Sequence, residues 1–405
     1  MDTHGESDAL SDVVSRQYER WVYPEPIEDL PGWLTSNWQW FDPSHSFRVL
    51  WPERTFRPDL DILVAGCGTN QAAVLAFTNP HARVVGIDVS DASLSHHRHL
   101  CNKYQLDNLE LHLLPIEYVG TLDRDFDLIV STGVLHHLAD PVVGMRALAQ
   151  CMRPDAVFAV MLYAAFGRLG VEMMQSVFRD LGLKQDSPSV TLVREAIAGL
   201  PPEHPLQAYL SMAPDLGDDA GIVDTFLHGR ERAYTIDDCR EIVAVAGLAF
   251  QDLFLRAPYY APVRTSNAFL TAVSRLPREM QWSVMERVNS RNACHFFMAR
   301  RGDQPPQEYA VDFTSPVALD FVPSFRYRCG FAGDQVVRPN WHMPLEPLEA
   351  AIAEQIDGTR SIRQLNAALD GSVTPVGDRE RLALDLVRNL WQLDFLAITL
   401  PGRRA

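Results

Sequence analysis

Apolar and polar positions alternate with a regular rhythm in the central part of the chain. Short apolar runs with the character of buried strands lie at residues 61–65, 83–88, 109–114, 126–131 and 157–163. Segments with helical spacing fall between them, at about residues 70–78, 92–104 and 141–152. Strands that alternate with helices in this way are typical of a parallel, doubly wound sheet. The pattern therefore predicts an α/β fold that binds its ligand beyond the carboxyl ends of the strands.

The regular alternation stops after the last of these runs. Residues 166–246 are mainly helical in character and are punctuated by prolines. Two more strand-like runs, at residues 248–255 and 293–300, resume the pattern, with a helical stretch over 266–289 between them. We therefore expect residues 166–246 to form a helical insertion in the sheet domain.

The first 57 residues are rich in aromatic side chains. Prolines at positions 24, 26, 31, 43 and 52 prevent a long helix there, although residues 8–20 can form a short one. So many rings must be buried, and we predict an N-terminal cap or lid, residues 1–57, over the mouth of the following domain. The rings are Tyr18, Trp21, Tyr23, Trp33, Trp38, Trp40, Phe41, Phe47 and Trp51.

The composition changes again after Arg301, where residues 302–306 look like a linker. We expect residues 302–405 to form a small, mainly helical third domain. Its helices are indicated by an apolar stripe that ends at Asp357-Gly358, by a capping box, and by a leucine repeat before a short strand over 395–400. The residues concerned are Leu345, Leu348, Ile352 and Ile356, then Ser361, Gln364 and Leu369, then Leu382, Leu386, Leu390 and Leu393. This order is similar to small winged-helix modules of peptide- and protein-modifying enzymes, and a structural or dimerising appendage is the alternative.

Size and composition limit the class of protein. A chain of 405 residues exceeds one typical core, and 47% hydrophobic with 22% charged residues is typical of soluble globular proteins. The net charge of −16 disfavours a nucleic-acid partner. No apolar run predicts a signal peptide or a membrane span, so a cytoplasmic protein is expected. The six cysteines form no C-x-x-C pair, which argues against a zinc site or a disulfide framework.

A glycine turn follows the first predicted strand, in the segment D-I-L-V-A-G-C-G-T of residues 61–69. Gly66 lies 22 residues before Asp88, which ends the second strand. That spacing is typical of a βαβ unit in which the acid accepts hydrogen bonds from a ribose diol. A dinucleotide site would need a third glycine at position 71, where the chain has Gln71. A nucleoside without phosphates is the better fit.

This turn resembles the first motif of the class I S-adenosylmethionine (SAM) methyltransferases. Residues 131–141, S-T-G-V-L-H-H-L-A-D-P, resemble the V-L-H-H-L-x-D-P stretch of the group that includes quinone, natural-product and some tRNA-modifying enzymes. The resemblance implies a Rossmann-like methyltransferase domain over residues 58–301. It also implies that the runs 248–255 and 293–300 complete the sheet as an antiparallel hairpin, with the insertion 166–246 on the substrate side.

The resemblance further implies a donor site at the carboxyl ends of the strands. Asp88 would hold the ribose hydroxyls and Val89 would touch the adenine. Ser131 and Thr132 would face the methionine part, and Tyr18 would close over the donor. The full predicted set is Tyr18, Ala65, Gly66, Cys67, Gly68, Asp88, Val89, Ile116, Glu117, Ser131 and Thr132.

The chain departs from the family pattern at three positions. Val64 stands where an acid is common, and Pro115 where an Asp often approaches the adenine, so Ile116 or Glu117 would take over that contact. Asn70 replaces the last glycine of the first motif, and Asn tolerates a positive φ better than most residues.

Four residues are candidates for catalysis. His136 or His137 could act as a base, because imidazole titrates near neutrality; capping or packing is the alternative. His228 lies four residues after Asp224, so the two are predicted to share a helix face that binds the acceptor, or else a solvated helix end. Tyr163, at the end of the fifth strand, occupies a position that often borders the acceptor in the family.

We therefore expect a SAM-dependent methyltransferase that acts on oxygen or nitrogen of a small organic acceptor and uses no metal. A protein or peptide methyltransferase that recruits its substrate through residues 302–405 is the nearest alternative. A non-catalytic SAM-binding scaffold is another, and Gln71 disfavours a nicotinamide oxidoreductase. The sequence leaves open whether the protein forms a homodimer.

Overall fold

The computed structural model describes residues 10, 12–261, 267–339, 341–366 and 375–402. These residues divide into two compact units. The first contains the described residues up to Trp40, together with Pro58–Phe250 and Glu286–Gln304. The second contains Phe41–Arg57, the described residues of Gln251–Met285, and those from Pro305 onward. The domain bounds expected from the sequence stay a prediction.

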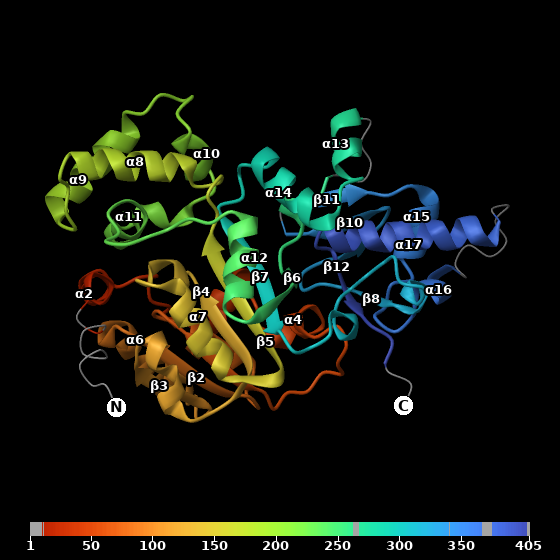
Figure 1. Cartoon of the computed structure of the whole chain (residues 1–405), viewed down its shortest axis with the longest axis horizontal. Helices are drawn as coiled ribbons and strands as arrows, with labels where there is room; N and C mark the ends of the chain where they lie inside the picture. The colour runs from red at the N-terminus through yellow and green to blue at the C-terminus, as the bar shows by residue number, and fades with distance from the viewer. Residues whose placement is uncertain (1–9, 11, 262–266, 340, 367–374, 403–405) are drawn as a thin grey trace. The chain divides into compact units, whose positions relative to one another are not determined.

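The first unit is built on a seven-stranded sheet with the strand order β3-β2-β1-β4-β5-β7-β6 (Figure 1). The strands are β1 (Asp61–Ala65), β2 (Arg83–Asp88), β3 (Leu109–Leu113), β4 (Phe126–Thr132), β5 (Met152–Tyr163), β6 (Leu248–Leu253) and β7 (Cys294–Arg301). Strands β1 to β5 pair in parallel, and β7 runs antiparallel to β5. All five residues of β1 are buried, which explains its uninterrupted apolar sequence. The expected α/β fold is confirmed.

Local signals start the helices between these strands. Ser90 caps helix α6, and Asp140 caps α7, whose first residue is Pro141. Helices α5 and α6 pack on β2 and β3, and α7 packs on β5. The bounds are α5 (Gln71–Thr78), α6 (Asp91–Tyr104), α7 (Pro141–Gln150) and α12 (Ile236–Val245).

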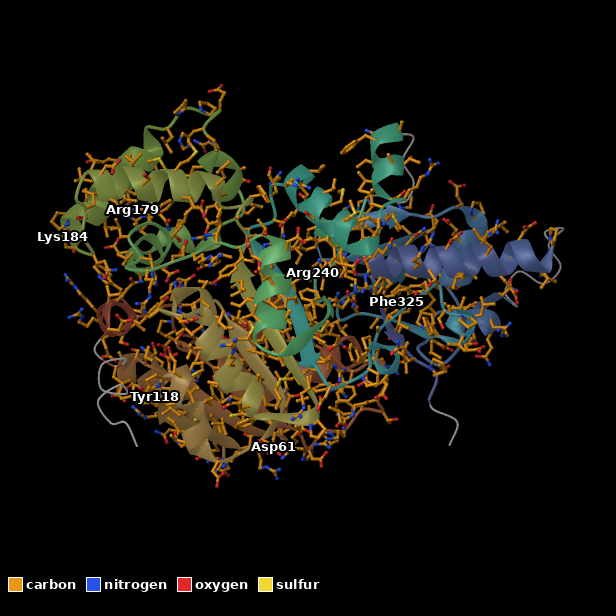
Figure 2. The ribbon with its side chains drawn as sticks, viewed as in Figure 1. Asp61, Tyr118, Arg179, Lys184, Arg240 and Phe325 are labelled. Carbon is orange, nitrogen blue, oxygen red and sulfur yellow. The ribbon has the colours of Figure 1, made fainter. Side chains whose placement is uncertain are left out.

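The insertion forms a helical group with a small core of its own, which includes Val171, Phe178 and Phe226. Its helices are α8 (Leu169–Asp180), α9 (Ser187–Ala198), α10 (Leu206–Leu210) and α11 (Asp219–Phe226). The arrowhead of β5 points toward this group (Figure 1). Arg179 lies on the insertion, whereas Asp61, the first residue of β1, lies at the other end of the sheet (Figure 2). The insertion therefore stands at the carboxyl ends of the strands.

The N-terminal segment contains only short helices, as its prolines predicted. Helix α2 (Val13–Arg20) falls within the expected range, of which residues 8, 9 and 11 lie outside the described part. Helices α3 (Leu30–Ser36) and α4 (Pro43–Leu50) each have a proline in the first turn. The stretch expected to be helical over 266–289 is two helices, α13 (Ala268–Val273) and α14 (Arg278–Val288), because Pro277 disfavours a continuous helix. Residue 266 lies outside the described part.

The second unit combines small sheets with helices around its own core. Strands β9 to β11 form one sheet, and β8 pairs with β12 in another. The capping box of Ser361 and Gln364 is confirmed, whereas Leu369 lies outside the described residues. The elements are β8 (Val322–Phe325), β9 (Gly330–Ala332), β10 (Gln335–Arg338), β11 (Trp341–Pro344), α15 (Pro347–Ala353), α16 (Ile362–Leu365), α17 (Val376–Gln392) and β12 (Leu396–Thr399).

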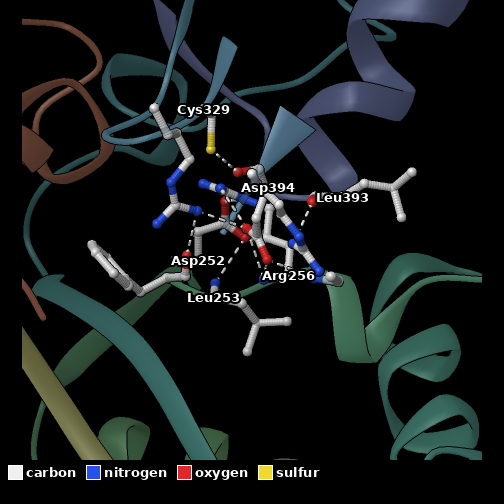
Figure 3. Close-up of polar contacts among 10 residues, drawn as sticks. Asp252, Leu253, Arg256, Cys329, Leu393 and Asp394 are labelled. Carbon is white, nitrogen blue, oxygen red and sulfur yellow. Dashed lines mark hydrogen bonds and ion pairs between the residues drawn. The ribbon is translucent and has the colours of Figure 1, made fainter. Parts of the chain in front are cut away.

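Asp394, which follows α17, organises a buried polar cluster in the second unit (Figure 3). Its carboxylate accepts hydrogen bonds from the backbone N–H groups of Arg256 and Ala257 and from the Arg326 side chain, at 2.7–3.1 Å. Asp252 pairs with Arg256 at 2.9 Å. Because each buried charge has an opposite charge beside it, the cluster is structural. Within the described residues, no helix has the length and apolar character needed to cross a membrane.

Candidate active site

A cavity of about 260 Å³ opens in the first unit at the carboxyl ends of β1, β2, β4 and β5. It is lined by Val14, Tyr18, Tyr23, Pro24, Gly66, Gly68, Asp88, Val89, Ser93, Leu114, Ile116, Thr132, Gly133, Val134, His137, Leu138, Met161, Tyr163 and Asp224. The position is the one that the strand pattern predicts for a ligand site in a doubly wound sheet.

The turn after β1 requires glycine. Gly66 and Gly68 have φ values of +74° and +56°, in the left-handed region that favours glycine. A Cβ atom on Gly66 would also lie 2.4 Å from a methyl group of Val134. Glycine at position 66 therefore allows both the positive φ and the close packing of the turn against Val134, and both glycines line the cavity.

Asp88 lies in the wall of the cavity next to this turn. The Gly68 N–H donates to its Oδ2 at 2.8 Å and the Ser90 N–H to its Oδ1 at 3.0 Å. Burial raises the pKa of Asp88 to about 6, although these bonds stabilise its charge. Each carboxylate oxygen keeps a second lone pair, so hydroxyl groups of a ligand can still donate to it.

The residues that depart from the family motif fit their surroundings in the structure. Asn70 has a φ of −148°, so the positive φ that its replacement of glycine suggested is not needed. Gln71 donates a hydrogen bond to Thr132 Oγ1 at 3.1 Å and so links helix α5 to the end of β4. Val64 is fully buried within β1.

The N-terminal segment reaches the glycine turn. Tyr23 and Pro24 line the cavity, and the carbonyl of Pro24 accepts a hydrogen bond from Thr69 Oγ1 at 2.8 Å. Tyr18, on α2, donates to Asp224 Oδ1 at 2.9 Å. The cavity thus lies among the sheet, this segment and the insertion.

His137 lines the cavity and has one ring nitrogen without a hydrogen-bond partner. Its Nδ1 lies 3.0 Å from the Arg230 carbonyl, which must accept the Nδ1 proton, and its buried Nε2 has no hydrogen-bond partner. Burial lowers the pKa of His137 to about 3, so the ring is neutral at pH 7 and Nε2 carries a lone pair. The ring of His228 stacks on it with centroids 3.8 Å apart.

His137, Asp224 and His228 have potential ligand atoms within 4.8 Å of one another, but their arrangement does not fit a metal site. The two imidazole rings are inclined by only 18°, so their lone pairs run side by side and do not converge. The Arg230 N–H donates to His228 Nδ1 at 3.0 Å, which leaves the proton of the neutral ring on Nε2.

Asp224 and His228 do not share a helix face, and that prediction is wrong. Helix α11 ends at Phe226, with Leu227 as its C-cap, so His228 lies beyond the helix. Both residues nevertheless meet Tyr18, whose ring centroid is 5.9 Å from that of His228. Burial raises the pKa of Asp224 to about 7. Tyr163 donates to its Oδ2 at 3.4 Å.

The structure brings many of the predicted residues to the cavity but not all of them. Those lining it are Tyr18, Gly66, Gly68, Asp88, Val89, Ile116, Thr132, His137 and Tyr163. Ala65 and Ser131 are fully buried within their strands, Cys67 is buried, and Glu117 is half-buried. His136 is 1% exposed and stacks on Tyr163 at 3.9 Å, while His228 stacks on His137.

Other lining residues were not among the predicted donor or catalytic residues. Gly133 has a φ of +76° directly after β4, and a glycine at a strand's carboxyl end is a signal that could have identified it. Asp224, which the sequence placed with His228 on a possible acceptor-binding face, reaches the cavity wall from helix α11 of the insertion. The rest are Val14, Tyr23, Pro24, Ser93, Leu114, Val134, Leu138 and Met161.

Comparison with known proteins finds a family match and similar folds. Residues 63–158 match a family described as a methyltransferase domain. The matched segment lies in the first unit, within its Rossmann-like sheet.

Over most of its length the chain is similar to a protein of Synechococcus sp. that is uncharacterized. The two are 28% identical over 401 residues, which are 95% of this chain and 92% of that protein. The structure of PKMT2 from Rickettsia typhi matches with a TM-score of 0.64 at 15% identity, over 89% of this chain and 76% of that one. A PKMT2 structure in complex with AdoHcy (S-adenosylhomocysteine) matches with a TM-score of 0.63 at 16% identity, over the same shares of the two chains. The likeness is one of fold, and it extends beyond the first unit.

Proposed function

We propose that this protein is a SAM-dependent methyltransferase that transfers the methyl group to an oxygen or nitrogen atom of a small organic acceptor. The observation that carries the proposal is the cavity itself. The cavity is lined both by a glycine turn, Gly66 and Gly68, whose positive φ values favour glycine, and by a buried carboxylate, Asp88, that can hold ribose hydroxyls.

The residues of the cavity suit this donor. Gly66 and Gly68 would lie against it, Asp88 would accept from the ribose, and Val89 and Ile116 offer apolar surface for the adenine. When bound, SAM supplies a methyl group on a sulfonium. The transfer is an in-line displacement, so the protein contributes mainly by aligning the two reactants and excluding water.

The other groups of the cavity would serve the acceptor. Nε2 of His137 can accept a proton or a hydrogen bond from it. No lysine or arginine is among the described residues that line the cavity, whereas Asp88 and Asp224 are. This charge distribution favours a neutral or cationic acceptor over an anionic one.

Calorimetry on the full chain tests the proposal. We expect both SAM and its demethylated product to bind with one site per chain. Binding of neither would contradict the donor assignment. Binding of both without methyl transfer to any acceptor would support a non-catalytic scaffold instead.

A further inference from the structure

Asp224 is a buried carboxylate in the cavity wall that makes no ion pair within the described residues, although the charge of Arg168 acts on it from a distance and lowers its pKa. It is 3% exposed, and the groups that donate to it are the hydroxyls of Tyr18, at 2.9 Å, and Tyr163, at 3.4 Å. Among the described residues, no lysine or arginine forms an ion pair with it. Arg168 pairs with Glu231 at 2.8 Å. A buried charge is normally paired, so a ligand that brings a positive charge would complete this site.

Aromatic rings surround the same place. The ring centroid of Tyr18 lies 6.5 Å from that of His137 and 5.9 Å from that of His228, and His137 lies 5.9 Å from Tyr163. The face of a tyrosine ring attracts cations electrostatically. The second unit offers a contrast, because its buried Asp394 already pairs with Arg326 at 2.7 Å.

We propose that Asp224, together with the hydroxyls of Tyr18 and Tyr163, forms a subsite for a protonated amine. The acceptor is then a primary or secondary amine. This inference rests on the proposed function and narrows its acceptor atom to nitrogen.

The transfer can be written with every atom and charge accounted for. The bound ammonium group gives one proton to the Asp224 carboxylate and becomes a neutral amine. Its lone pair attacks the methyl carbon, the new N–C bond forms, and the S–C electron pair stays on sulfur. The products are a neutral thioether and an N-methylammonium ion, and Asp224 then releases its proton to water.

Burial raises the pKa of Asp224 to about 7, which suits both parts of this role. Above pH 7 the carboxylate is ionised and can bind an ammonium group. A carboxyl group with an ordinary pKa near 4 would be a much weaker proton acceptor.

The test uses the full chain saturated with the demethylated donor, S-adenosylhomocysteine. Calorimetry at pH 8 compares n-butylamine with n-butanol, a neutral molecule of nearly the same shape. We expect the amine to bind about tenfold tighter or more, as charge-assisted hydrogen bonds predict. Asp224→Asn should remove this difference while leaving the affinity for S-adenosylhomocysteine unchanged. Asp219→Asn, an exposed acid on the same helix that pairs with Arg194, is the matched control.

Several outcomes would overturn the subsite. If the wild type binds the amine and the alcohol equally well, or shows no detectable binding of the amine, the subsite is overturned without any variant. A sulfonium is also an organic cation, so SAM and S-adenosylhomocysteine must be compared. If Asp224→Asn weakens binding of SAM but not of its product, which lacks the sulfonium charge, the carboxylate pairs with the donor and the amine assignment fails. If the wild type binds neither nucleoside, the proposed function itself fails.

Discussion

The hydroxyl of Tyr18 donates a hydrogen bond to Asp224 Oδ1 at 2.9 Å, although 206 residues separate them in the chain. One residue comes from helix α2 at the N-terminus and the other from helix α11 of the insertion. Both side chains line the cavity, so the bond joins two segments of its wall. The wall of this site is therefore assembled from segments that sequence order keeps far apart.

Replacing Tyr18 by Phe keeps the ring and removes this bond. We expect the free energy of unfolding to fall by about 1 kcal/mol, a typical net value for one hydrogen bond. The pKa of Asp224 should rise further, since the Tyr18 hydroxyl stabilises its ionised form. Chemical denaturation measures the first effect, and the pH dependence of n-butylamine binding measures the second. An unchanged binding midpoint would show that the bond does not form in solution.

Asp88→Ala should weaken binding of S-adenosylhomocysteine about tenfold or more. The reason is that hydrogen bonds to a charged group contribute about 1.5–3 kcal/mol. Calorimetry on the purified protein provides the measurement. Asp91→Ala, an exposed position in the first turn of α6, should leave the affinity unchanged. Wild-type affinity in the Asp88 variant would remove the ribose contact from the proposed site.

Gly66→Ala should abolish donor binding and destabilise the fold by about 1–3 kcal/mol, owing to strain at positive φ and contact with Val134. Gly182→Ala separates the two causes. Gly182 also has a positive φ, +67°, but a Cβ atom there would meet nothing within 4 Å. This control should therefore show only the backbone cost, about 1–2 kcal/mol, with normal donor affinity. Equal behaviour of both variants would contradict the role of close packing at Gly66.

His137→Ala should lower the rate of methyl transfer to any acceptor that the wild type methylates, while sparing affinity for S-adenosylhomocysteine. His137 lines the cavity and its buried Nε2 has no hydrogen-bond partner, so the loss should appear in kcat. His99→Ala, on the exposed side of α6, serves as the control. A rate equal to that of the wild type would assign His137 to packing alone.

Asp224 should make the protein less stable as pH rises from about 4 to about 7. Its pKa is about 7 in the folded state and about 3.9 in the unfolded state, so between these values the folded protein binds more protons. Unfolding then releases a proton, and stability falls with rising pH before it levels above pH 7. Asp224→Asn should remove this contribution. The difference between the denaturation free energies of the two proteins, followed from pH 5 to pH 8, measures it; a constant difference would contradict the shifted pKa.

The local pattern of apolar residues was sufficient to predict the strands in much of the sheet. The bounds of β1 and β2 agree with the predicted runs because buried strands read as continuous apolar segments between turn residues. Pro277 divided the predicted helix over 266–289, since the residue before a proline avoids helical backbone. Asn70 shows the limit of motif comparison, because only its backbone geometry reveals that no positive φ is required there.

The sequence by itself determined the α/β class, the glycine turn and the partnership of that turn with Asp88. These features depend on spacing within one βαβ unit, where short-range geometry leaves few alternatives. Only the tertiary structure decided which residues line the cavity. It placed His137 at the cavity and His136 against Tyr163, although the two histidines are adjacent, and it brought Asp224 to Tyr18. Burial and side-chain direction depend on packing between distant segments, which spacing along the chain does not specify.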